Sequence, residues 1–148
     1  MRTIQESISA DEKWADLNRQ ALEYAKHFEW GLYTNTQLEM ADLLKEEGKH
    51  KHELELLFWV LYLDINGPEN RRDVPSDLLK EFPPFDVEMA IVPPAIAKRS
   101  AILLAELGLG ADAARSMFIQ CATKRRNKLM PVPPDRAWDD LQKFLFTN

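Results

Sequence analysis

The stretch Ala41-Asp-Leu-Leu-Lys-Glu-Glu-Gly48 recurs later in the chain as Ala101-Ile-Leu-Leu-Ala-Glu-Leu-Gly108. Both copies fit the pattern A-x-L-L-x-E-x-G, and a second helical pattern follows each of them. A glycine between two amphipathic helices is typical of the tight turn in an antiparallel helix pair. The repetition predicts an all-α chain built from stacked helical hairpins, an architecture that more often holds partners than catalyses reactions.

Apolar spacing predicts two helices in the N-terminal part of the chain. The first is expected from Asp11 to about Trp30, and Gly31 should help to end it. The second is expected from about Thr36 to Glu47, where Gly48 stops it. The stripe of the first helix recurs every three or four positions, at Trp14, Leu17, Ala21, Tyr24 and Phe28.

A third helix is expected from about Lys49 to Ile65, before the stop signal Asn66-Gly67-Pro68. Its centre, from Leu54 to Leu63, is apolar on nearly every side. Such a helix must be covered all round, so we expect it to be the central helix of the fold. Trp59 or Tyr62 is expected at the edge of that cover.

The segment 66–93 is a proline-rich connector between two helical hairpins, expected at about 34–65 and 94–126. A short helix is predicted at about 76–82 within it. Because the connector is also rich in apolar residues, we expect it to pack against the body. It is therefore interpreted neither as a flexible linker nor as a domain boundary, and residues 1–148 are predicted to form a single helical domain.

Three further helices are predicted after the connector, at 94 to about 107, 111 to about 126, and from about Pro134 onward. Together with the others they make about seven helices, with no convincing sheet. The side chains expected to face inward on the three helices are Ala97, Ala101, Leu103, Leu104 and Leu107, then Ala114, Met117, Phe118 and Cys121, and finally Trp138, Leu141 and Leu145.

Both hairpins resemble the tetratricopeptide repeat, a unit of about 34 residues with small side chains where its two helices cross. When Gly48 is placed at the inter-helix glycine, Ala41 matches the small position and Leu44 the large apolar one. The copy aligned on Gly108 matches at Ala101, Leu104 and Ala113. The chain departs from the motif at Glu53, where the family has alanine, and the connector interrupts regular stacking. The resemblance implies a protein-binding module.

Composition describes a globular chain of 148 residues, with 45% apolar and 29% charged residues. A single cysteine, Cys121, excludes an intramolecular disulfide and fits a reducing compartment. The N-terminal residues show no signal-peptide pattern, and the longest apolar run, Leu56–Leu63, is too short to span a membrane. The prediction is a cytoplasmic protein with no membrane contact.

Acidic residues are in excess over 1–93 and basic residues over 94–148, although the net charge is −5. Two such ends could steer a partner or pair between protomers, and solvated helix faces would also account for them. The basic cluster 124–128 suits a helix C-terminus and leaves open a nucleic-acid-associated regulator. A sequence pI near 5.2 makes nucleic acid the less favoured partner.

The sequence contains little that indicates catalysis or metal binding. His27, His50 and His52 are the residues on which a metal-binding protein or helical enzyme would depend, but none lies in a metal-binding motif. His50 and His52 point about 200° apart on a helix and cannot share an ion there. Cys121 sits on an apolar stripe, and Arg125 is placed to lower its pKa. No catalytic residue, cofactor or metal site is predicted.

The predicted function is therefore that of a non-enzymatic interaction or adaptor module, which holds a peptide or a partner helix in a groove between helices. Self-association is the other expectation, because the two ends of a helical stack need covers. Aromatic and basic side chains are the candidate partner-binding residues. These are Trp30, Tyr33, Lys98, Arg99, Arg125 and Arg126.

Overall fold

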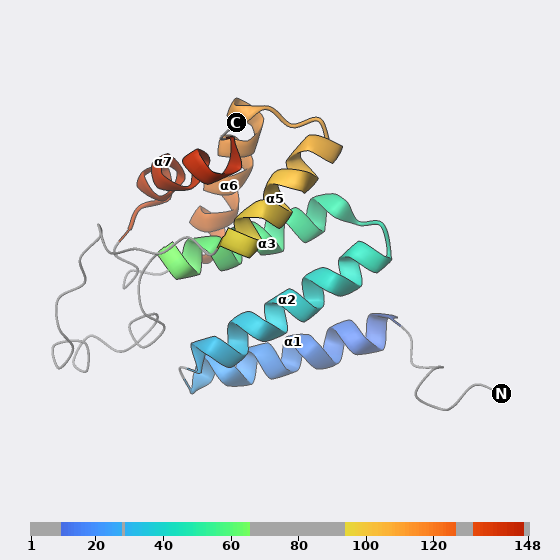
Figure 1. Ribbon diagram of the computed structural model, residues 1–148. Coiled ribbons are helices and arrows are strands. Elements are labelled where there is room, and N and C mark those ends of the chain that lie inside the picture. Colours follow the sequence, from blue (N-terminus) through green and yellow to red (C-terminus); the bar gives the residue numbers. More distant parts are fainter. Residues whose placement is uncertain (1–9, 28, 66–93, 127–131, 147–148) are drawn as a thin grey trace, which may run out of the picture.

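The protein is seen in a computed structural model, which describes residues 10–27, 29–65, 94–126 and 132–146. Within these ranges the secondary structure is helical and contains no strand, so the all-α prediction is confirmed for them. The short helix expected at 76–82 and the packing of the 66–93 connector lie outside the described residues. The described helices are α1 (Ala10–Lys26), α2 (Trp30–Glu46), α3 (His50–Ile65), α5 (Pro94–Glu106), α6 (Ala111–Arg125) and α7 (Pro134–Leu145) (Figure 1).

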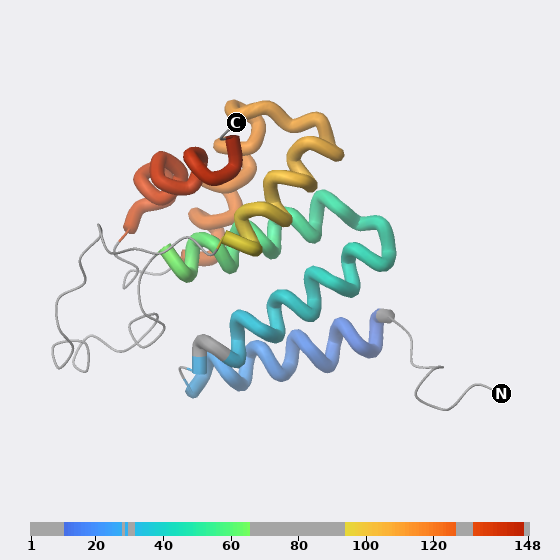
Figure 2. The backbone as a smooth tube through the Cα atoms, viewed as in Figure 1, coloured from blue at the N-terminus to red at the C-terminus, as the bar shows by residue number. Residues whose placement is uncertain are grey.

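α3 is the central helix, as its apolar sequence predicted. It runs between an antiparallel pair, α1 and α2, and a group formed by α5, α6 and α7 (Figure 2). Every residue from Leu56 to Leu63 is buried. The expectation that Trp59 or Tyr62 lies at the edge of the cover is wrong, since they are 5% and 0% exposed. Both can be buried because each polar group is bonded: Trp59 Nε1 donates to the Tyr33 hydroxyl at 2.9 Å, and the Tyr62 hydroxyl donates to the Val132 carbonyl.

The two A-x-L-L-x-E-x-G copies end in turns of the same construction. Gly48 and Gly108 have φ angles of +74° and +68°, in the left-handed region that glycine adopts without a steric penalty. After α2 the Gly48 N–H bonds the Lys45 carbonyl and the Lys49 N–H bonds the Leu44 carbonyl. The corresponding groups around Gly108 repeat both bonds after α5. This is the Schellman arrangement, and it confirms each glycine as an inter-helix turn.

The two predicted hairpins pack differently. α2 and α3 lie antiparallel against each other, as expected. α5 and α6 instead have α3 and α7 as their main neighbours, within the described residues, rather than one another. The Phe118 ring of α6 packs on Phe58 of α3 and Trp138 of α7, with ring centroids 5.5 and 5.7 Å away. These aromatic contacts, and a connection of residues 107–110 that is one residue longer than 47–49, account for the difference.

Two predicted helix boundaries are also wrong. α1 ends at Lys26, where the Glu29 N–H bonds the Tyr24 carbonyl, and α2 begins at Trp30. Gly31 therefore lies in the first turn of α2 and does not end α1. Leu107 was expected to face inward but is 36% exposed, because α5 ends at Glu106 and leaves Leu107 in the turn.

The remaining inward-facing predictions hold for the C-terminal helices. Ala97, Leu103 and Leu104 of α5 are buried, as are Ala114 and Phe118 of α6, while Ala101, Met117 and Cys121 are half-buried. α7 buries Trp138, Leu141 and Leu145. No helix in the described part of the chain has the length and apolar character needed to cross a membrane.

Candidate functional site

Two grooves flank the N-terminal half of α3. The first, here the α1–α3 groove, has a volume of about 410 Å³ and lies between α1, α2, α3 and the end of α6. Its apolar lining comes from Trp14, Leu43, Leu44 and Leu56, which the stripes of three different helices bring together. Its rim is charged, formed by Asp11, Glu47, Lys49, His52, Glu55 and Arg125.

The rim charges of the α1–α3 groove are partly neutralised by one another. Lys49 Nζ lies 3.0 Å from a Glu47 carboxylate oxygen, and His52 Nδ1 lies 3.6 Å from one of Glu55. Arg125 is exposed, and its guanidinium carbon lies 5.7 Å from the centroid of the Trp59 ring. This cation–π contact positions the guanidinium, and because Arg125 is exposed its N–H groups remain open to a ligand.

Trp59 links two of the predicted partner-binding residues. Its indole N–H bonds Tyr33 of α2, and its ring supports Arg125 of α6. Arg126 is half-buried and makes interactions of its own. Trp30 belongs to the first turn of α2, but its side chain lies outside the described part of the structure. The sequence pattern predicted Trp59 only as a residue at the edge of the cover around α3, because Tyr33 and Arg125, which it contacts, are remote in the chain.

The second groove, here the α5 groove, has a volume of about 450 Å³ and lies between α5 and the adjoining ends of α2 and α3. Lys98 and Arg99 line it, so these two predicted residues do not join Arg125 and Arg126 in one basic patch. Ile102 lines it too and is 51% exposed. Ala95 and Leu103 complete its apolar lining, so the α5 groove, like the α1–α3 groove, combines apolar and charged side chains.

An ion pair between the buried Glu53 and the half-buried Arg99 lies at the floor of the α5 groove. The Glu53 side chain is 1% exposed, and its Oε2 accepts from Arg99 Nε at 3.0 Å and lies 2.9 Å from Nη2. Arg99 Nη1 reaches Asp42 of α2 at 2.9 Å, and His50 Nδ1 lies 3.3 Å from Glu53 Oε1. Arg99 thus ties together α2, α3 and α5, so its predicted partner-binding role competes with a structural one.

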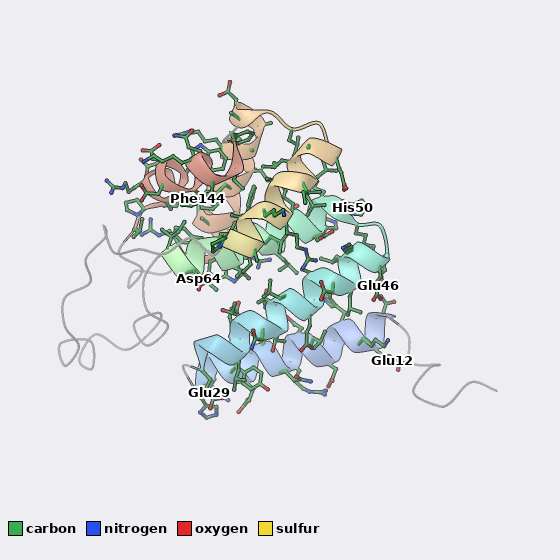
Figure 3. All side chains as sticks on the ribbon, in the orientation of Figure 1. Glu12, Glu29, Glu46, His50, Asp64 and Phe144 are labelled. Atoms are coloured by element: carbon green, nitrogen blue, oxygen red, sulfur yellow. The ribbon has the colours of Figure 1, made fainter. Side chains whose placement is uncertain are left out.

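The three histidines are separated from one another. His50 lies at the start of α3 (Figure 3) and lines the α5 groove, whereas His52 lines the α1–α3 groove. The third, His27, pairs with Glu23 at 3.0 Å on the exposed face of α1. No group of three metal-binding side chains occurs among the residues that the structure describes.

Cys121 is half-buried on α6, close to Glu55 and Arg125. Burial is the main cause that raises the pKa of its thiol, and the negative charge of Glu55 adds to the increase. Arg125, Lys124 and Lys51 act in the opposite direction without overcoming it. Arg125 therefore acts on this pKa in the predicted direction, but burial outweighs it, and the thiol stays protonated at neutral pH.

In a comparison with known proteins, no family model matches the chain, and no significant match was found among the curated proteins or the solved structures.

Proposed function

We propose that the protein is a non-enzymatic interaction module whose α1–α3 groove binds a helical segment of a partner protein. One observation carries the proposal: the groove has an apolar lining from Trp14, Leu43, Leu44 and Leu56, of which Trp14 and Leu43 are half-exposed, and charges border it. Amphipathic helices bind such grooves by inserting apolar side chains at helical spacing while their polar face meets the rim.

Arg125 gives this groove a polar anchor. A guanidinium fixed over the Trp59 ring loses little freedom when it binds a carboxylate, and Arg and Trp are common among residues that dominate binding energy. The proposed occupant is therefore a short amphipathic helix with an acidic residue beside its apolar stripe. Asp11, on the α1 wall, favours a basic residue at the opposite flank of that helix.

A tetratricopeptide-like relationship between the two units forms part of the proposal. Its support is the A-x-L-L-x-E-x-G repeat together with the matching hydrogen bonds around Gly48 and Gly108. The different packing of α5 and α6 limits the likeness to the local design of each unit. Binding in a groove between neighbouring helices is the property that the relationship contributes.

Selection of random helical peptides on the immobilised protein tests the proposal. Selected peptides should share an apolar stripe with a flanking acidic residue. Their affinity, measured by calorimetry, should fall at least about tenfold for Leu43→Glu, which places a charge in the apolar lining. Arg125→Glu should weaken peptides with the acidic residue and spare those in which it is replaced by glutamine.

Leu22→Glu is the matched control, because Leu22 is 65% exposed on α1 and does not line the groove. This variant introduces the same charge into the same antiparallel pair of α1 and α2, but outside the groove, so peptide affinity should not change. If no peptide is enriched, or if the enriched peptides bind Leu43→Glu as tightly as the original protein, the proposed function is wrong.

A further inference from the structure

The face of α5 beside the α5 groove carries a row of three exposed side chains. Lys98, Ile102 and Glu106 are four residues apart in turn, so they lie one above another along a single face of the helix. All three line the α5 groove. The row therefore presents a positive charge, an apolar side chain and a negative charge, in that order.

Neither charge of this row has an ion-pair partner within the described residues. The two cannot pair with each other, since eight residues of helix separate them by about 12 Å. Their order also opposes the helix macrodipole, which favours acidic residues near the N-terminus and basic residues near the C-terminus. Glu106 ends α5, and the first turn holds no acidic residue. Helix stability therefore does not explain the placement of these charges.

The row is complementary to itself when reversed. If a second α5 lies antiparallel against the first, with the two Ile102 side chains facing each other, each Lys98 meets the Glu106 of the other copy. A two-fold axis through Ile102 generates both ion pairs at once, which is the property of an isologous interface. We propose that two copies of this chain associate through α5, arranged antiparallel about Ile102.

The surroundings of the row suit a close helix crossing. Ala95 and Ala105 are exposed beside it and are small enough to let two helix backbones approach. Leu107, at 36% exposure, extends the apolar surface at the end of the helix. Since α5 is only 13 residues long, the buried area falls in the range of small interfaces, and a dissociation constant in the micromolar range is expected.

Charge reversal separates this arrangement from other occupants of the same surface. Lys98→Glu alone, or Glu106→Lys alone, places like charges opposite each other at both ends of the interface. Each should raise the dissociation constant at least about tenfold. The double variant Lys98→Glu/Glu106→Lys restores both pairs with their signs exchanged, and its charges also agree with the macrodipole, so the variant should fold and dimerise again.

Sedimentation velocity over a concentration series from low to high micromolar measures the result. Circular dichroism confirms that each variant remains helical. Ile102→Asp should abolish dimerisation, whereas Leu22→Asp, an equal change on exposed α1, should leave it intact. A chain that stays monomeric over the whole series overturns the proposal. So does a double variant that dimerises no better than the single ones, a result that would point instead to a different partner on this face.

Discussion

At the scale of single residues, Glu53 shows how one polar side chain is accommodated in an apolar helix. A carboxylate that is 1% exposed requires an opposite charge and hydrogen bonds to offset the loss of water. Arg99 supplies both and His50 adds a third contact. The residue that compensates the Glu53 charge therefore comes from the other half of the chain.

Arg99→Met is expected to destabilise the protein by about 3 kcal/mol, because it leaves the Glu53 charge buried without its partner. The free energy of unfolding, measured by urea titration at neutral pH, checks the value. Asp42→Asn is the control: Asp42 contacts the same guanidinium but is 62% exposed, so its loss should cost less than about 1 kcal/mol.

Glu53→Met/Arg99→Met extends this prediction. Replacing both partners by apolar side chains of similar length should recover most of the lost stability, since neither charge is then left buried. Equal costs for Arg99→Met and Asp42→Asn would contradict the prediction and show that the buried pair contributes no more than an exposed one.

At the scale of elements, the turns after α2 and α5 depend on backbone geometry alone. A methyl group added to Gly48 or Gly108 would meet no atom within 4 Å, so crowding does not explain why glycine stands there. The positive φ does, since other residues adopt it at a cost of about 1–2 kcal/mol. Gly48→Ala and Gly108→Ala should each lower the free energy of unfolding by about 1 kcal/mol.

Gly110→Ser is the matched control for the turns. Gly110 has an ordinary φ of −79°, open space around it, and the N-cap position of α6 without a side-chain hydrogen bond. Serine there can cap the helix, so stability should rise by a few tenths of a kcal/mol. A loss for Gly110→Ser as large as that for Gly48→Ala would show that chain flexibility, and not the sign of φ, governs these turns.

Helices and turns could be predicted from the sequence where a single physical signal determines them. A long apolar run before the stop signal Asn66-Gly67-Pro68 located α3, and two turns were located by Gly48 and Gly108. The start of α2 was missed because Gly31 reads as a helix stop, whereas contact between Tyr33 and Trp59 favours extending the helix through it. The grooves could not be predicted for a related reason. Trp59 and Arg125 meet only when α3 packs on α6, and the α1–α3 groove forms only where four helices come together.

At the scale of the whole molecule, the two proposed surfaces lie on different sides of α3. His50 lines the α5 groove and His52 the α1–α3 groove, and two residues apart on a helix means directions about 200° apart. Two copies joined through α5 would therefore leave both α1–α3 grooves accessible. Such a dimer would bind two partner segments and gain affinity for any partner that carries both.

Packing also varies from the centre of the molecule to its edge. α3 contacts α2, α5, α6 and α7, whereas α1 has α2 as its main neighbour and only Ala21 among its described residues is buried. Helices with few buried contacts open locally at lower free energy than the core. Amide hydrogens of α1 should therefore exchange with solvent at least about 30-fold faster, relative to their intrinsic rates, than those of α3.

Hydrogen exchange followed by mass spectrometry measures this gradient, and α7 provides the internal comparison. Like α1, α7 is a terminal helix of the described structure. It packs on α5, α6 and α3 and buries Trp138, so the protection of its amides should approach that of α3. Protection of α1 equal to that of α3 would contradict the gradient. Because Trp14 of α1 lines the α1–α3 groove, a bound peptide from the selection above should slow exchange in α1 more than in α7.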